Sequence, residues 1–463
     1  MSLSLGFLNA KLFFCLCVTF LKHHFTFSAS NPTGLTLRAV LDDSSGSPLY
    51  LIENLTIAER TERLIKVTNA RANYLSLVSN CDARIHPDNI PMPISREGLF
   101  YVVEFAIGSQ HHKMKLLMDT GGGLIWTQCV PCKTCFPQNL PIFNPSASAT
   151  YARLPCDHPL CKGPGDRYTC FDGFCVYNVH YTGGASTRGT ASMETFHFSI
   201  YQSEIESFKN VIFGCSDDSS DIFFKNTDIS GIFGLSMSPD SMMMQFSSFI
   251  HSRFSYCLVP FADAIPRPLV LRFGEDIPQL PPDVRTTSFV QSPTNHFYYL
   301  ELWGISVAGH RLPFSQSTFQ YRANGKGGCF IDSGALFTQI DAGTVGINAY
   351  AAVMQVFASY YESKSLRRTT SRGFELCYER PPNYDDFASL TFHFNGADYT
   401  VAGEYVNLIS PDIFCVAIIK GTYATMLGAW QQQNKRLIYD VGMGALQFAD
   451  ENCSLSTKST NKN

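Results

Sequence analysis

Short apolar and aromatic runs, separated by turn-forming residues, recur along the chain from Gly98 onward. Two examples are Phe100–Phe105 and Phe297–Leu302, in which Phe, Tyr, Val and Leu surround a single Glu. Runs of this length and composition, bounded by Gly and Pro, are typical of β-strands. The pattern therefore predicts a mostly β protein.

A longer pattern occurs twice. An apolar run ends in Asp, then a small hydroxyl residue and Gly, with Asp119 inside Lys115–Trp126 and Asp332 inside Cys329–Phe337. Further along each half, another apolar run ends in Gly; these runs are Ser230–Leu235 and Ala424–Ala429. Two copies of one β unit predict a bilobal fold, with two β lobes related by a pseudo-twofold axis. The two Asp side chains would then meet in the cleft between the lobes.

The chain divides into four predicted segments. Residues 1–30 combine Lys11, the apolar run Leu12–Leu21 and small residues at 28–30, which is typical of a signal peptide and too short to span a membrane. Residues 31–95 contain a charged run with helical periodicity, Ile57–Val67, before a Pro-rich linker. We expect a removable pro-segment there, with a helical cap that stays attached as the alternative. Residues 96–289 and 290–463 would form the N-terminal and C-terminal β lobes.

Composition narrows the class of protein. The chain has 463 residues, of which 45% are hydrophobic and 16% charged, so it can bury large cores. The net charge is -4 and no Lys/Arg run occurs, so neither nucleic acid nor a membrane surface is expected as a partner. The acidic loop with Asp217, Asp218 and Asp221 lacks the ligand spacing of a calcium site. We expect a monomer without metal or cofactor.

Cysteine usage indicates an oxidising compartment. Thirteen of the 16 Cys lie from Cys129 onward, and several are clustered, which favours disulfides in an exported chain. Metal binding and redox exchange stay open as alternatives, because Cys129 and Cys132 have the spacing of a redox pair. An odd count leaves one thiol unpaired, and Cys329 is the candidate. The predicted disulfide cysteines are Cys129, Cys132, Cys135, Cys156, Cys161, Cys170, Cys175, Cys215, Cys257, Cys377, Cys415 and Cys453.

Two facing Asp side chains suit acid hydrolysis. Carboxylates about 3 Å apart repel by roughly 5 kcal/mol at an effective dielectric constant of about 20, so the pair holds a single proton over a wide acidic range. The ionised member can deprotonate a water molecule while the protonated member hydrogen-bonds the carbonyl under attack. We therefore predict Asp119 and Asp332 as catalytic. The hydroxyls of Thr120 and Ser333 and the amides of Gly121 and Gly334 are placed to brace them.

Together these motifs resemble the pepsin-like aspartic proteases, and most closely the nepenthesin-type, atypical group of plants. Further shared motifs are Trp126–Cys129, Phe213–Cys215, Phe254–Leu258, Gln431–Asn434 and Tyr439-Asp440. The resemblance implies a secreted endopeptidase that cleaves peptide or protein substrates at acidic pH. The extracellular space is its expected location, with the vacuole as the alternative. Sequons at Asn54 and Asn452 predict glycosylation.

The resemblance also implies particular residue roles. Tyr181 would be the Tyr of a flap hairpin that closes over substrate, with its turn at Gly183 and Gly184, which is a turn signal by itself. Trp126 would line an apolar subsite, although an ordinary core Trp is the alternative. Implied disulfides are Cys257 with Cys453, Cys377 with Cys415, and nested pairs among the insert cysteines Cys156, Cys161, Cys170 and Cys175.

Three residues depart from the family pattern. Relatives usually have Ser and Asp where this chain has Gly122 and Gly123, and Thr where it has Ala335. Two hydroxyls that hydrogen-bond the outer carboxylate oxygens are thus missing, and a hydrogen bond to a charged group is worth about 1.5 to 3 kcal/mol. We expect the pH optimum to move toward neutrality. A weakly active or inactive homologue that binds a partner protein, and a glycosidase with paired carboxylates, are the alternatives.

Overall fold

The computed structural model describes residues 34–41, 65, 68–69 and 101–454, with gaps at 163–166, 181–184, 200–204, 221, 223–227, 262–268, 280, 293–294, 323, 345 and 372. The chain divides into two units, 1–33 and 34–463. The predicted signal peptide, residues 1–30, lies outside the described residues. Asn54 lies outside them as well. Among the described residues, no helix is both long and apolar enough to cross a bilayer.

The first Asp motif lies at the end of a strand in a compact β unit. Strand β2 (Tyr101–Ile107) runs antiparallel to β3 (His112–Asp119), as the first apolar run predicts. Strand β10 (Gly231–Gly234) runs parallel to β3 and antiparallel to β4 (Trp126–Gln128). In this register Gly234 lies opposite Asp119.

The second half repeats the same unit. Strand β14 (Tyr298–Leu300) runs antiparallel to β17 (Cys329–Asp332). Strand β26 (Thr425–Gly428) runs parallel to β17 and antiparallel to β18 (Thr338–Asp341). Gly428 lies opposite Asp332, as Gly234 lies opposite Asp119. The duplication predicted from the sequence is therefore confirmed at the level of strand register.

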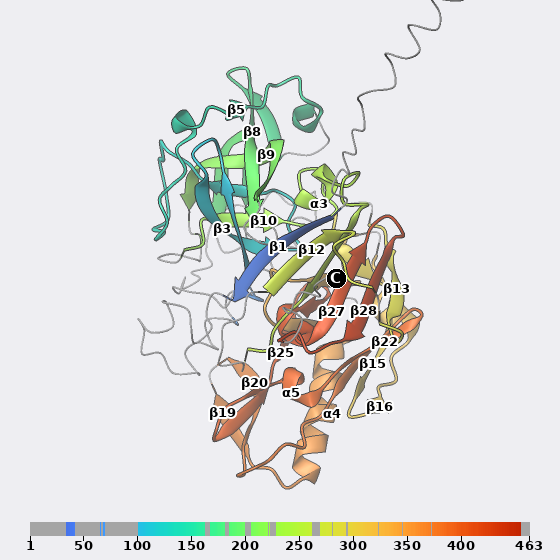
Figure 1. The fold of residues 1–463 in the computed structure, drawn as a ribbon. Coiled ribbons are helices and arrows are strands. Elements are labelled where there is room, and N and C mark those ends of the chain that lie inside the picture. Colours follow the sequence, from blue (N-terminus) through green and yellow to red (C-terminus); the bar gives the residue numbers. More distant parts are fainter. Residues whose placement is uncertain are drawn as a thin grey trace, which may run out of the picture. The chain divides into compact units, whose positions relative to one another are not determined.

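Strands from both halves also build one common sheet. Strand β11 (Arg253–Cys257) pairs with β12 (Leu269–Gly274) on one side and with β27 (Lys435–Asp440) on the other. Next to β27 come β28 (Ala445–Asp450) and then β13 (Arg285–Val290). Figure 1 shows β27 and β28 side by side. The two halves are thus joined by backbone hydrogen bonds.

Two pieces of the predicted pro-segment belong to this framework. Strand β1 (Gly34–Leu41) pairs with β12 and with β2, so it extends the common sheet. Ile65 is buried in the main core, and the Thr68 hydroxyl accepts a hydrogen bond from the backbone N–H of Phe337 at 3.2 Å. Thr68 therefore contacts the residue that precedes β18.

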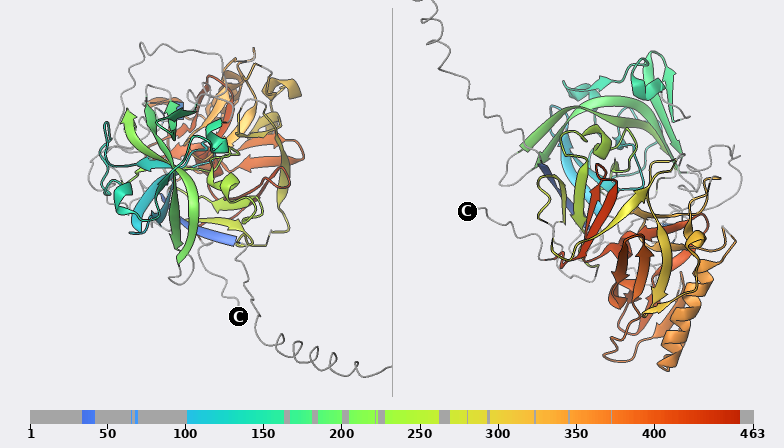
Figure 2. Two further views of the ribbon diagram at one scale, coloured as in Figure 1. Left: turned by 90° about the horizontal axis from the view of Figure 1, so that it is seen from above. Right: turned by 90° about the vertical axis from the view of Figure 1, so that its right-hand side faces the viewer.

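Long strands and a short hairpin form the outer part of the first half. Strands β8 (Ser186–Ser199) and β9 (Ile205–Ser220) pair along most of their length and arch across this half in Figure 2. Strand β7 (Phe174–His180) pairs with β8 and with β6 (Tyr168–Phe171). The short β5 (Ala152–Arg153) also pairs with β8.

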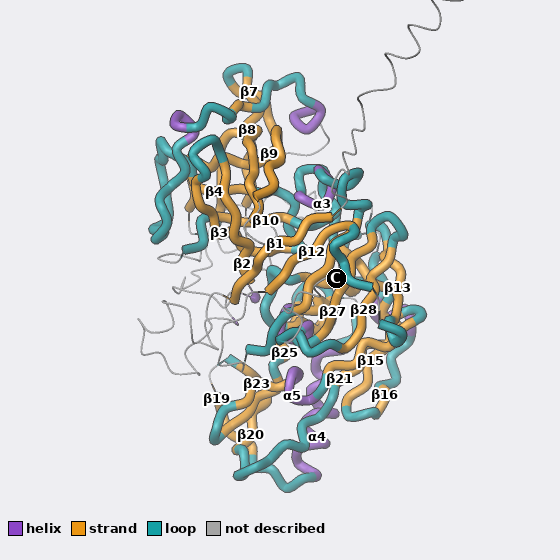
Figure 3. Tube along the Cα trace, in the orientation of Figure 1, coloured by secondary structure: helices purple, strands orange, loops and turns teal. Residues whose placement is uncertain are grey.

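The second half carries two further sheets and the longest helix of the described residues (Figure 3). Helix α4 spans Ala349–Ser363, with the Asn348 side chain accepting a hydrogen bond from the N–H of Ala351 as N-cap. The sequence Asp341–Val345 before an amphipathic run to Tyr361 predicts a helix that starts at Asp341. This start is wrong, because Asp341 is the last residue of β18. The remaining elements are β15 (Leu302–Val307), β16 (His310–Arg311), β19 (Arg368–Ser371), β20 (Phe374–Glu379), β21 (Leu390–Phe394), β22 (Ala397–Val401), β23 (Asn407–Ile409), β24 (Ile413–Val416), β25 (Ile418–Gly421), and the short helices α3 (Met242–Gln245) and α5 (Gly403–Val406).

Six disulfides form among the described residues, and Cys329 is the unpaired cysteine there, fully buried in the core. Two of the pairs that the resemblance implies, Cys257–Cys453 and Cys377–Cys415, are present. The nested arrangement expected in the insert is wrong, because the two bonds interleave along the chain. The insert pairs are Cys156–Cys170 and Cys161–Cys175, and the other two bonds are Cys129–Cys215 and Cys132–Cys135.

Candidate active site

The two Asp turns meet at one point. A Cβ atom built on Gly334 would lie 2.6 Å from Asp119 Oδ1 and 3.2 Å from Asp332 Oδ1. The two oxygens are therefore no more than about 6 Å apart, a range in which carboxylates influence each other's protonation. Asp119 is 1% exposed and Asp332 is fully buried. The pairing expected from the duplicated motif is present in the structure.

Reciprocal hydrogen bonds join the turns. The N–H of Thr120 donates to Ser333 Oγ at 3.1 Å, and the N–H of Ser333 donates to Thr120 Oγ1 at 2.9 Å. Ser333 Oγ in turn donates to the carbonyl of Met118 at 3.0 Å. Because both side chains are buried, each hydroxyl satisfies a backbone group that has no water to bind. The small hydroxyl residue after each Asp thus fixes one turn against the other.

Within each turn the glycine amide holds the carboxylate. The N–H of Gly121 donates to Asp119 Oδ1 at 2.9 Å, and the N–H of Gly334 donates to Asp332 Oδ1 at 2.8 Å. Hydrogen bonds from backbone amides stabilise the ionised form of a carboxylate. Each Asp is therefore oriented by its own turn, and the two turns are related by the internal repeat.

The glycine-ending strands explain why these turns form. Leu235 N–H donates to the carbonyl of Asp119 at 2.8 Å, and Ala429 N–H donates to the carbonyl of Ala335 at 2.8 Å. A Cβ on Gly234 would lie 2.0 Å from the carbonyl oxygen of Gly123, so only glycine permits this approach. The second apolar run of each half thus supports the Asp turn of the same half.

The residues that replace the family's hydroxyls, Gly122 and Ala335, lie in the two Asp turns. A Cβ on Gly122 would lie 2.4 Å from Asp119 Oδ2, so that oxygen occupies the volume a serine side chain would need. Ala335 is fully buried and carries no hydroxyl at the corresponding position of the second turn. The departures noted in the sequence therefore affect the immediate surroundings of the Asp pair.

Two buried tyrosines, Tyr256 and Tyr439, belong to a hydrogen-bond network that reaches the second Asp turn. The sequence motifs that contain them gave no indication of this contact. The hydroxyls of Tyr256 and Tyr439 are 2.7 Å apart, and Tyr256 also donates to Gln432 Oε1 at 2.8 Å. Gln432 Nε2 donates to the backbone carbonyl of Asp332 at 3.4 Å. Burial raises the pKa of Tyr439 well above its usual value, while a hydrogen bond from Thr120 acts against this. The two tyrosines stay neutral. Tyr439 contacts the first turn through Thr120, and Gln432 contacts the second turn through the carbonyl of Asp332.

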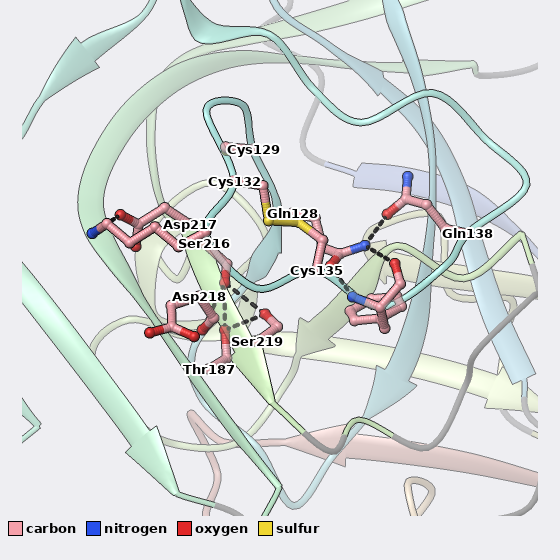
Figure 4. The surroundings of a disulfide bond; sticks show 12 residues. Gln128, Cys129, Cys132, Cys135, Gln138, Thr187, Ser216, Asp217, Asp218 and Ser219 are labelled. Atoms are coloured by element: carbon pink, nitrogen blue, oxygen red, sulfur yellow. Dashed lines mark hydrogen bonds and ion pairs between the residues drawn. A yellow bond between two sulfur atoms is a disulfide. The ribbon is translucent and has the colours of Figure 1, made fainter.

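The side chain of Gln128 holds the backbone of Phe136 in place by two hydrogen bonds. Its Nε2 donates to the carbonyl of Phe136 at 3.0 Å, and its Oε1 accepts from the N–H of Phe136 at 2.9 Å. Figure 4 shows Gln128 beside the Cys132–Cys135 disulfide. Phe136 packs edge-on against Trp126, with ring centroids 6.4 Å apart. Trp126 is fully buried. Its role, as a residue of an apolar subsite or as an ordinary core Trp, stays a prediction.

The predicted flap residues Tyr181, Gly183 and Gly184 lie outside the described residues. The strands on either side of them are paired, with His180 opposite Ser186. Among the described residues, no group of His, Cys, Asp and Glu side chains could hold a metal ion. Asp217, which belongs to the acidic loop noted in the sequence, forms an ion pair with Lys133, with 2.7 Å between Asp217 Oδ2 and Lys133 Nζ.

Two duplicated β halves, a common sheet and an Asp turn from each half define a pepsin-like protein. The chain matches two family models, described as xylanase inhibitor N-terminal over residues 101–275 and xylanase inhibitor C-terminal over residues 297–450. Aspartic proteinase nepenthesin-1 of Nepenthes gracilis is 32% identical over 411 residues, covering 87% of this chain and 88% of that protein. Nepenthesin-2 of the same species is 31% identical, with 87% and 88% covered.

The solved structure "Crystal structure of edgp" matches with a TM-score of 0.62 at 16% identity, covering 79% of this chain and 95% of the other, which supports the fold alone. The sequence matches go further, because they combine identity above 30% with nearly complete coverage of both chains. The chain therefore belongs to the pepsin-like aspartic protease family of plants, in the group that contains the nepenthesins.

Proposed function

We propose that the protein is a secreted aspartic endopeptidase that hydrolyses peptide bonds in protein substrates at acidic pH. The main observation behind the proposal is the closeness of the two carboxylates. A Cβ on Gly334 would lie 2.6 Å from Asp119 Oδ1 and 3.2 Å from Asp332 Oδ1. The Thr120–Ser333 hydrogen bonds hold the two turns in this arrangement. The names of its relatives as aspartic proteinases support the same activity.

In the proposed reaction the pair carries one proton. The ionised Asp takes a proton from a bound water molecule as the water oxygen attacks the peptide carbonyl carbon. The protonated Asp donates its hydrogen bond to the carbonyl oxygen, which becomes a hydroxyl of the tetrahedral intermediate. Collapse of the intermediate returns a proton to the leaving nitrogen, so no covalent bond forms between enzyme and substrate.

The contacts of residues 34–41 and of Thr68 support a zymogen. Strand β1 occupies the sheet position beside β2 and β12, and Thr68 O accepts from Gln339 Nε2 at 2.9 Å. Removal of residues 31–95 would free this sheet position and the strand after the second Asp turn. We propose that these residues form the pro-segment, and that the mature enzyme acts outside the cell or in the vacuole as a monomer.

The test is cleavage of an unstructured protein by the processed protein across about pH 3 to 7. Cleavage that is abolished by a pepstatin-type inhibitor and by Asp119→Asn is expected. Cleavage that survives the substitution would remove the Asp pair from the mechanism. A rate profile that peaks below about pH 3 would contradict the shift toward neutrality expected from Gly122 and Ala335.

A second candidate function is protein binding with little proteolysis. The loss of both hydroxyls beside the carboxylates favours it, as does the description of the matching family models as xylanase inhibitors. Inhibition of a microbial xylanase by the Asp119→Asn variant, together with no peptide cleavage by the unmodified protein, would support this function over the first.

A further inference from the structure

Asp240 is a buried carboxylate outside the catalytic pair. It lies between β10 and α3, is 1% exposed, and accepts hydrogen bonds from three side chains. Ser238 Oγ donates to its Oδ1 at 2.5 Å, while Tyr168 and Arg167 donate to its Oδ2 at 2.5 and 2.9 Å. A buried carboxylate is stable as an anion only when it is paired in this way. The Arg167–Asp240 contact is therefore an ion pair between a buried carboxylate and a half-buried guanidinium.

This carboxylate lies directly against the first catalytic turn. A Cβ built on Gly123 would lie 2.6 Å from Asp240 Oδ1 and 2.4 Å from Ser238 Cβ. Asp240 thus occupies the volume in which a side chain at position 123 would begin. The family resemblance implies an acid at position 123, and this chain places the Asp240 carboxylate 2.6 Å from the point where the Cβ of that residue would lie.

The turn, Asp240 and the cysteine-rich insert are mechanically connected. The N–H of Ser236 donates to the carbonyl of Gly122 at 3.0 Å, so the segment that carries Asp240 is bound to the turn. Arg167 and Tyr168, which donate hydrogen bonds to Asp240, lie at the start of the β6/β7 hairpin. Cys156–Cys170 and Cys161–Cys175 join that hairpin to the segment that precedes it in the chain. Asp240 therefore lies between the catalytic turn and a covalently braced hairpin.

We propose that Asp240, held by Arg167, is a positioning residue for the catalytic turn, taking the place of the acid that is missing at Gly123. It acts on Asp119 through Gly122 and Gly123, without touching substrate. The proposal rests on the proposed proteolysis for its kinetic readout, but its structural readout is independent of activity.

Charge at this site depends on a small set of neighbours. Burial acts to raise the pKa of Asp240, but Arg167, Ser238 and Tyr168 together hold it below its usual value. His296 faces the same pair, and burial, with Arg167 adding to it, lowers its pKa. Among the described residues named here, Arg167 is the cation that pairs with Asp240. Removing Arg167 or removing Asp240 should therefore have the same effect on the first Asp turn.

The test relocates the carboxylate. Asp240→Ala removes it, and the triple variant Gly123→Asp/Ser238→Gly/Asp240→Ala supplies it from position 123 with the obstructing Ser238 side chain removed. The matched control Gly123→Asn/Ser238→Gly/Asp240→Ala has the same shape without the charge. Each processed protein is assayed for kcat and KM on one peptide between about pH 3 and 7. Hydrogen exchange is followed in parallel in the fragment covering residues 117–126.

Asp240→Ala and Arg167→Ala should each lower kcat by about tenfold to a hundredfold with KM nearly unchanged, and their combination should cost no more than either alone. Exchange in residues 117–126 should become faster. The relocated Asp should restore both kcat and slow exchange, and the Asn control should restore neither. Unchanged exchange in Asp240→Ala, or equal behaviour of the Asp and Asn variants, would overturn the proposal. If the unmodified protein cleaves nothing, the proposed function fails, and the exchange data still decide the positioning role.

Discussion

Gly334→Ala tests the shared contact of the Asp pair most sharply. Gly334 has no positive φ, so alanine is tolerated by its backbone, and the only obstacle is the space around the new methyl group. That methyl would lie 2.6 Å from Asp119 Oδ1 and 3.2 Å from Asp332 Oδ1. Carbon and oxygen atoms that are not bonded pack at more than about 3.2 Å, so Asp119 must move by about 0.6 to 1 Å.

The expected loss follows from this displacement. A misplacement of about 1 Å costs roughly a hundredfold in rate, or about 2.7 kcal/mol of transition-state stabilisation. We expect kcat/KM to fall by about that factor, while overpacking lowers the free energy of unfolding by only about 1 to 3 kcal/mol.

The assay is peptide hydrolysis by the processed variant, with thermal unfolding measured on the same sample. Gly442→Ala is the matched control, because a methyl group there would meet its nearest atom at 3.5 Å, an ordinary contact. Gly334→Ala activity within twofold of the unmodified protein would show that the two carboxylates do not meet at this glycine.

Three further predictions concern stability. Thr120→Val and Ser333→Ala should each lower the free energy of unfolding, and urea titrations should give a double variant less destabilised than the sum by about 1 kcal/mol; additive losses would deny that the two hydroxyls act as a pair. Because the folded-state pKa of Asp240 is lowered, its contribution is present above its unfolded value of about 4 and is lost as the pH falls through the folded value, so Asp240→Asn should be less stable at pH 7 and approach the unmodified protein in acid. A stability difference that stays constant with pH would argue against ionised Asp240. Removing Cys257–Cys453, which closes a separation of 196 residues, should destabilise more than removing Cys132–Cys135, with a separation of 3; equal unfolding midpoints would contradict the loop-entropy argument.

The repeat could be predicted from the sequence because its signals are local. An apolar run that ends in Asp-Thr-Gly or Asp-Ser-Gly specifies a strand and a turn within a few residues, and the glycine-ending runs supplied the strands that support those turns. The same locality explains why β2 and β14 were recognised from their aromatic composition.

Features that depend on distant partners could not be predicted in this way. Asp341 resembles a helix start, but Thr338–Asp341 is drawn into a strand by pairing with β25 and β26. The insert cysteines pair in an interleaved way, with two separations of 14 residues, but the sequence alone does not distinguish this pairing from a nested one. Asp240 and Gly123 are far apart in sequence, and only the structure shows that they share one site.

The most direct test of the central claim is kcat/KM for Asp119→Asn, Asp332→Asn and the double variant on one peptide at the pH optimum. If the two carboxylates share one proton and act as a unit, each single substitution should abolish hydrolysis as completely as both together. A single variant that keeps a substantial fraction of the activity would show that one carboxylate works without the other, and would contradict the paired mechanism.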